Sequence, residues 1–207
     1  MGHLAEITTA GPRTARRASR WLLALCLAAA MTSLGCAATS DYMQRPATPV
    51  APKPRPDSAL VVFIQPSSWA GTVVTTILDG NGRFLGDSIP GSNFAVQVPP
   101  GKHLFISWAE NTAAVQALLA PGRTYYIEVS PRMGVLTPRV QLIALTPRSE
   151  SWGKVSDWLR ETEFYVVDEA RGQGYLQGRA EDTRERIRRG NEILTENDHE
   201  ELAERTL

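Results

Sequence analysis

The sequence has little cysteine and little histidine, the residues on which disulfide frameworks and many metal sites depend. Only two cysteines and three histidines occur among its 207 residues. One cysteine, Cys26, lies inside an N-terminal apolar run, so neither a disulfide framework nor a cysteine-rich zinc cluster is expected. No two histidines have the helical or hairpin spacing of metal ligands, and we expect neither a metal nor a cofactor.

An excess of charge of one sign is also lacking. Lys+Arg and Asp+Glu each number 22, which leaves a formal net charge of zero. Residues 1–35 hold four arginines and one acid, so the remainder carries 18 basic and 21 acidic residues. A mildly acidic body lacks the basic footprint of a nucleic-acid-binding protein, and no nucleic-acid partner is expected.

The N-terminus has the organisation of a secretory signal. A basic segment that ends at Arg20 precedes an apolar run, Trp21–Met31, of eleven residues. This run is too short to cross a bilayer core of about 30 Å as a helix. A basic region, a short apolar region and then small residues are typical of a cleaved signal peptide.

The residues that follow are more specific. Thr32-Ser33-Leu34-Gly35-Cys36 resembles the lipobox of bacterial lipoprotein precursors, although Ser33 stands where leucine is commonest. The resemblance implies cleavage between Gly35 and Cys36, and acylation of Cys36, which would anchor the chain to a membrane. Two or three acyl chains hold a protein firmly, whereas one chain does not. Ala37 after the cysteine resembles lipoproteins sent to the outer membrane, which implies its periplasmic face in a Gram-negative envelope.

Two other interpretations of the leader stay open. One is an ordinary signal peptide in which Cys36 is incidental. The other is a twin-arginine signal at Arg16-Arg17, although Ala18-Ser19-Arg20 lacks the apolar residues that such signals carry next.

The segment after the anchor is rich in proline. Five prolines fall between Pro46 and Pro56, and no apolar periodicity is present there. Proline favours the extended polyproline II conformation of about 3.1 Å per residue, so Ala37–Ser58 is predicted to be a tether of roughly 70 Å. The chain is therefore predicted to consist of a signal peptide (1–35), a lipidated cysteine and tether (36–58), a β domain (59–147) and a C-terminal extension (148–207).

Residues 59–147 contain short runs with strand patterns, separated by turn residues. Ala59–Gln65 is continuously apolar, and Phe94–Val98 alternates apolar and less apolar residues with a period of two. Seven or eight such strands without an intervening helical period predict a mainly β fold, an antiparallel β-sandwich. The predicted core comprises Val61, Phe63, Ile77, Phe94, Val96, Leu104, Ile106, Trp108, Tyr125, Ile127, Val140 and Leu142.

This segment resembles a family of bacterial lipoprotein domains, domain of unknown function 2846. The residues that carry the resemblance are Ser58–Ser68, Ile77-Leu-Asp-Gly80, Gly86, Asn93-Phe94, Val98–His103 and Gly122–Ile127. A wider resemblance is to the small envelope repeat named after Pro-Glu-Gly-Ala, which shares the Asp-Gly turn and the Pro-Gly-Lys-His hairpin. The family implies a β-sandwich on a membrane-tethered protein and no assigned activity.

Beyond Pro147 the composition becomes acidic and helical. Residues 150–207 hold nine basic and fifteen acidic residues. A helix is expected from Ser151 to about Arg160, then an extended segment at Phe164–Val167. Glycines are expected to break the chain at Gly172–Gly174 and to end a polar helix at Gly190. The extension is either a marginally ordered tail or a helical segment held by a partner.

Candidate functional residues are few. Trp69, Trp108 and Tyr126 could form an aromatic binding surface, although strand aromatics are more often core residues. Gly86-Asp87-Ser88-Ile89 resembles the nucleophile block of GDSL esterases, and the partner histidine would have to be His199. We expect no catalytic residues and predict a non-enzymatic binding or scaffolding module, with an envelope protein or peptidoglycan as partner. The alternative is a serine hydrolase that uses Ser88.

Overall fold

The computed structural model describes residues 38–48, 52–66, 73–133 and 138–196. These residues all belong to one compact unit of the chain, Ala38–Leu207. The predicted signal peptide, Gly35, Cys36, Trp69 and His199 lie outside the described residues.

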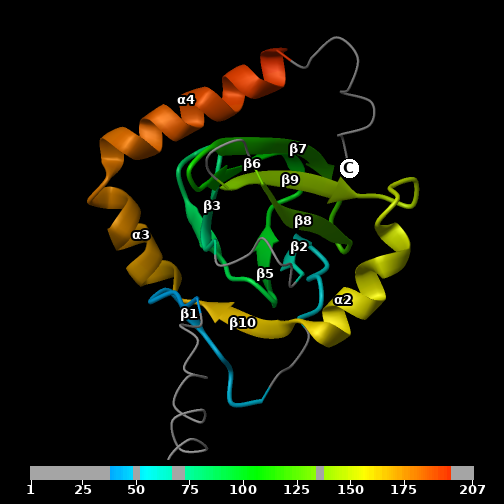
Figure 1. Cartoon of the computed structure of the whole chain (residues 1–207). Coiled ribbons are helices and arrows are strands. Elements are labelled where there is room, and N and C mark those ends of the chain that lie inside the picture. The colour runs from blue at the N-terminus through cyan, green and yellow to red at the C-terminus, as the bar shows by residue number, and fades with distance from the viewer. Residues whose placement is uncertain (1–37, 49–51, 67–72, 134–137, 197–207) are drawn as a thin grey trace, which may run out of the picture. The chain divides into compact units, whose positions relative to one another are not determined.

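The fold is mainly β, with two sheets and C-terminal helices (Figure 1). One sheet has six strands in the order β1-β10-β5-β2-β8-β9, and the other has four in the order β4-β3-β6-β7. The six-stranded sheet consists of β1 (Met43–Gln44), β10 (Glu163–Val167), β5 (Ser92–Val98), β2 (Ala59–Gln65), β8 (Thr124–Met133) and β9 (Pro138–Leu145). The four-stranded sheet consists of β4 (Phe84–Ser88), β3 (Thr75–Asp79), β6 (Gly101–Trp108) and β7 (Thr112–Leu119).

The expectation of a wholly antiparallel sandwich is wrong for the larger sheet. Strand β2 pairs in parallel with β8, and β10 pairs in parallel with β5, while the four-stranded sheet is antiparallel throughout. Strand β10 comes from the segment that was predicted to lie beyond the β domain. The sheet therefore extends past residues 59–147 and includes the extended segment predicted at Phe164–Val167.

Residues 38–45, the N-terminal strap, are part of the fold, and the prediction of a tether is wrong for them. Met43 is buried and pairs through β1 with Val167 at the edge of β10. The Tyr42 ring lies between Phe84 and Tyr175, with centroid distances of 5.6 and 5.3 Å. Proline spacing gave no sign of these contacts, because each partner is distant in the sequence.

The main core fills the space between the two sheets. Phe63, Phe94 and Phe105 form its aromatic centre, with ring centroids 5.1 Å and 5.6 Å from Phe63. Strand β2 alternates between two environments, since Val61 and Phe63 face this core while Leu60 and Val62 face the opposite side. Both faces of β2 are buried, which explains its continuous apolar run.

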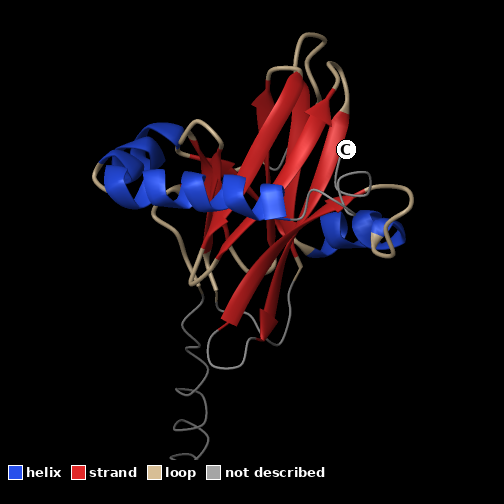
Figure 2. Ribbon diagram, turned by 90° about the horizontal axis from the view of Figure 1, so that it is seen from above, coloured by secondary structure: helices blue, strands red, loops and turns tan. Residues whose placement is uncertain are grey.

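The outer faces of both sheets are covered by helices, which lie on both sides of the strands in Figure 2. Helix α2 (Val155–Glu161), which follows a 3-10 helix (Trp152–Lys154), packs over Leu60 and Val62 of the six-stranded sheet. Helices α3 (Glu169–Gln177) and α4 (Ala180–Glu196) pack against the four-stranded sheet.

Part of the predicted core is wrong, because some of its residues lie under the helices and not between the sheets. In β6 the residue that faces the space between the sheets is Phe105, whereas Ile106 is buried on the outer, helix-covered face. Leu104 and Trp108 are only half-buried on that same outer face, and Tyr125 is half-buried beside the main core. The remaining eight predicted residues are buried between the sheets: Val61, Phe63, Ile77, Phe94, Val96, Ile127, Val140 and Leu142.

The predicted glycine breaks are wrong for a related reason. Helix α3 runs through Gly172 and Gly174, and α4 runs through Gly190. A Cβ atom on Gly172 would lie 2.1 Å from Phe84 Cδ1, and one on Gly190 would lie 2.9 Å from Ile106 Cδ1. These two glycines allow the helices to approach the sheet closely, at a cost in intrinsic helix propensity.

Candidate ligand-binding pocket

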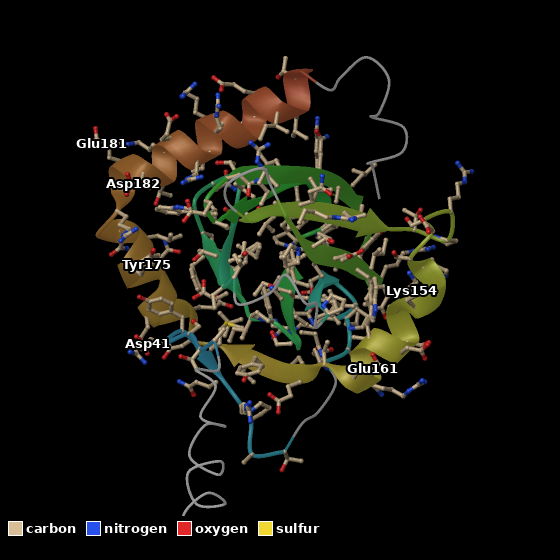
Figure 3. The ribbon with its side chains drawn as sticks, in the orientation of Figure 1. Asp41, Lys154, Glu161, Tyr175, Glu181 and Asp182 are labelled. Atoms are coloured by element: carbon tan, nitrogen blue, oxygen red, sulfur yellow. The ribbon has the colours of Figure 1, made fainter. Side chains whose placement is uncertain are left out.

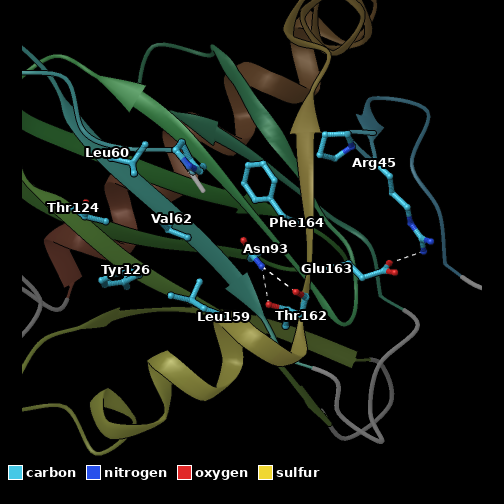
Figure 4. A pocket seen from close by; sticks show the side chains of 13 residues that line it. Arg45, Leu60, Val62, Asn93, Thr124, Tyr126, Leu159, Thr162, Glu163 and Phe164 are labelled. Carbon is cyan, nitrogen blue, oxygen red and sulfur yellow. Dashed lines mark hydrogen bonds and ion pairs between the residues drawn. The ribbon is translucent and has the colours of Figure 1, made fainter. Parts of the chain in front are cut away.

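A pocket of about 530 Å³ opens on the outer face of the six-stranded sheet, beside α2. Its floor is made by side chains that point away from the main core. Leu60 and Val62 come from β2, Ala95 from β5, and Thr124 and Tyr126 from β8 (Figure 4). Strand pairing places them in adjacent rows, because Val62 is opposite both Ala95 and Tyr126.

One wall of the pocket is the C-terminal end of α2. Leu159 and Thr162 line it. The Asn93 side-chain amide on β5 donates to the Thr162 hydroxyl at 2.8 Å, and that hydroxyl donates to the Trp158 carbonyl at 2.6 Å. Asn93 is buried, so this pair fixes the end of α2 against the sheet.

The other wall is formed by β10 and the segment that follows β1. Glu163 and Phe164 of β10 line it together with Arg45 and Pro46. Arg45 forms an ion pair with Glu163 at 2.5 Å, and its Nε donates to the Tyr165 hydroxyl at 2.8 Å. Both charged side chains are more than half exposed, so their pair stabilises the fold little. They give a mostly apolar pocket a polar rim.

The volume of this pocket falls within the range found for small-ligand sites. Ligand pockets typically have about 300–1,000 Å³ and apolar walls with a few polar groups. The ionisable side chains among the lining residues are Arg45, Glu163 and Tyr126. Arg45 and Glu163 neutralise each other, and the arrangement presents no pair of a nucleophile and a base.

Trp108 and Tyr126, the two described residues of the predicted aromatic surface, lie apart from each other. Tyr126 lines the pocket beside α2, whereas Trp108 lies on the other sheet, in the outer cluster under α3 and α4. Arg179 and Arg186 lie over the Trp108 ring at 5.9 and 5.3 Å from its centroid. Trp108 thus serves as a packing platform for these helices and lines a separate, polar depression of about 400 Å³.

The residues that resemble the esterase block have structural contacts. Ser88 is 1 % exposed, and its hydroxyl donates to the Gln65 side-chain oxygen at 2.7 Å. Gly86 has φ +150°, and a Cβ there would lie 2.6 Å from Phe94 Cε2. His103 is hydrogen-bonded to the carbonyl of Pro99. This geometry gives no support to Ser88 as a nucleophile.

Asp87, in the same block, has a buried carboxyl group. It accepts hydrogen bonds from the Ser40 hydroxyl at 2.6 Å and the Thr76 hydroxyl at 2.8 Å. Its backbone N–H donates to Met43 Sδ at 3.2 Å. Burial raises the pKa of Asp87, and the hydrogen bonds from Ser40 and Thr76 oppose that rise. Asp87 therefore ties the N-terminal strap to β4.

The described part of the chain shows neither a metal centre nor a membrane span. No three His, Cys, Asp or Glu side chains come together there as metal ligands would. None of the helices in those residues combines the length and the apolarity needed to cross a bilayer.

Comparisons of the chain with models of protein families, with curated proteins and with solved structures found no match. The resemblance of residues 58–147 to the lipoprotein domain family therefore stays a prediction from the sequence.

The pocket residues were largely missed by sequence reasoning, which named only Tyr126 among them. Leu60, Ala95 and Leu159 lie far apart in the sequence and have no common motif. The signal that could have indicated them is the continuous apolar run of six residues from Ala59 to Ile64. Such a run requires a second covering layer, and an incompletely covered outer face leaves a pocket.

Proposed function

We propose that this chain is an envelope lipoprotein, anchored through Cys36, that binds a small amphipathic ligand in the pocket beside α2 without transforming it. The binding role is proposed because of the pocket itself. Leu60, Val62 and Ala95 form its floor, and the Arg45–Glu163 pair lies at its rim. An apolar floor favours the apolar body of a ligand, and the charged rim suits a polar end that stays in water.

The anchoring role rests on the sequence of the leader. A basic region, a short apolar run and Leu34-Gly35-Cys36 occur in the order that lipoprotein precursors require. Acyl chains on Cys36 would hold the protein at a membrane, and we place it at the periplasmic face of the outer membrane. An envelope protein or peptidoglycan remains the proposed partner of a scaffolding role.

The binding role can be tested with an environment-sensitive apolar probe. Anilinonaphthalene sulfonate should bind the purified protein saturably, and Ala95→Phe should reduce its affinity several-fold by filling the floor of the pocket. Leu118→Phe is the matched control, because Leu118 is 58 % exposed on β7. Probe binding that is absent, or equal in both variants and the parent, would refute the pocket as the site.

A further inference from the structure

The described fold begins close to the proposed anchor. Ser40 is hydrogen-bonded through its hydroxyl to Asp87, and the same hydroxyl accepts the backbone N–H of Tyr42 at 3.1 Å. Only three residues, Ala37, Ala38 and Thr39, lie between Cys36 and Ser40. An extended chain spans at most about 3.6 Å per residue, so the Cα atoms of Cys36 and Ser40 are no more than about 14 Å apart.

This distance is short relative to the domain. A compact unit of about 170 residues has a radius of gyration of about 15 Å, so its diameter exceeds the length of the connection. The proline-rich segment cannot lengthen the connection, because it follows β1 and joins two strands of the same sheet. A domain held in this way cannot stand clear of the surface to which Cys36 is attached.

The strap is held to the domain at several points, so the connection cannot lengthen by local detachment. Met43 is buried, and β1 pairs with β10. The Tyr42 carbonyl accepts the backbone N–H of Asp168 at 2.8 Å, at the start of α3. Tyr42 also lies against Tyr175 of α3. The residues that follow the anchor thus contact β4, β10 and α3.

The exposed chemistry of this edge suits lipid headgroups. Asp41 and Arg171 are exposed charged residues that act on Tyr42, whose half-buried ring packs against the half-buried ring of Tyr175. Tyrosine is enriched where apolar and aqueous phases meet, and arginine side chains extend toward headgroups from such positions. The mixture of charges fits a zwitterionic surface as well as an anionic one.

We infer that the edge formed by the N-terminal strap and the first half of α3 lies against the headgroups of the bilayer that holds Cys36. This inference rests on the proposed lipidation and deepens it, since it specifies which surface of the domain faces the membrane. The domain lies on the bilayer, and the 70 Å tether expected from the sequence does not separate the two.

The test places one fluorophore at a time on the lipidated full chain in vesicles. Once Cys26 is removed with the leader and Cys36 is acylated, no native thiol remains. Asp41→Cys therefore reports on the proposed contact edge, and Lys154→Cys reports on a different side of the molecule (Figure 3). The vesicles contain a phosphatidylcholine with a nitroxide in its headgroup, which quenches fluorophores near the surface.

Quenching should be several-fold stronger at position 41 than at position 154. A flexible Gly/Ser spacer of about 20 residues after Ala37, with a root-mean-square length of about 25 Å, should lower quenching at position 41 to the level at 154. Equal quenching at the two positions of the parent chain, or no effect of the spacer, would overturn the inference.

Fatty-acid incorporation measured on the same preparations tests the proposed lipid anchor separately from the proposed membrane-facing edge. Absence of label on Cys36 would refute the proposed anchoring and, with it, the inference. Labelled protein with equal quenching at positions 41 and 154 would refute only the membrane-facing edge.

Discussion

Replacing Gly172 by alanine should destabilise the protein, although alanine is the better helix former. Gly172 lies in α3 against Phe84, and a Cβ there would meet the ring at 2.1, 2.3 and 2.5 Å. Phe84 is fully buried, and its backbone N–H donates to Gln173 of the same helix at 2.9 Å. Neither the ring nor the helix can therefore shift without loss of other contacts.

The magnitude follows from two opposing contributions. The gain in helix propensity on Gly→Ala is about 1 kcal/mol. Forcing an extra methyl group into a packed core costs about 1–3 kcal/mol, and a contact this short belongs at the upper end of that range. The net result for Gly172→Ala is a loss of about 2 kcal/mol in the free energy of unfolding.

Gly174→Ala supplies the matched control in the same helix. A Cβ on Gly174 has no neighbour within 4 Å, so the propensity gain of about 1 kcal/mol should appear alone. Urea unfolding of the chain from residue 37, followed by tryptophan fluorescence, measures both variants. Equal free energies for the two variants, or a stabilised Gly172→Ala, would show that α3 does not pack on Phe84 as described.

Three further predictions concern buried polar contacts. Ser40→Ala removes a hydrogen-bond donor to Asp87 and should lower the free energy of unfolding by about 1–3 kcal/mol. Thr39→Ala, at an exposed neighbouring residue, should lower it little, and urea unfolding compares the two variants. Because burial raises the Asp87 pKa, its carboxyl favours the fold most at acid pH, and this contribution is lost as pH rises from about 3.9 through the folded-state pKa. The free energy of unfolding of Asp87→Asn should lack that decline. If the free energies of unfolding of parent and variant changed with pH in parallel, the prediction would be contradicted. Asn93→Ala should cost about 1–2 kcal/mol by releasing Thr162, and should speed hydrogen exchange at the end of α2; unchanged exchange there would argue against the contact.

The sequence predicted the mainly β class because short alternating strands and turn residues are local signals. Phe94–Val98 illustrates this, since Phe94, Val96 and Val98 face the main core as their period of two indicates. In β6 the same reasoning assigned the wrong face, because the outer face is apolar too. Only the presence of α3 and α4 distinguishes Phe105, between the sheets, from Ile106, beneath the helices.

Long-range pairing accounts for most of what the sequence did not indicate. The parallel partners of β2 and β10 lie far away in the chain, and no local pattern specifies them. Gly172 and Gly190 were interpreted as helix breakers, because their contacts with Phe84 and Ile106 are invisible locally. The pocket has the same origin, since four strands, one helix and the segment after β1 contribute to it.

The central claim, that a lipid on Cys36 holds this domain at a membrane, is tested most directly by the intact mass of the mature N-terminal peptide. We predict that protein extracted from membranes begins at Cys36 and carries the added mass of a diacylglyceryl group and an amide-linked acyl chain. An N-terminus at another residue, or a Cys36 with a free thiol, would contradict the account.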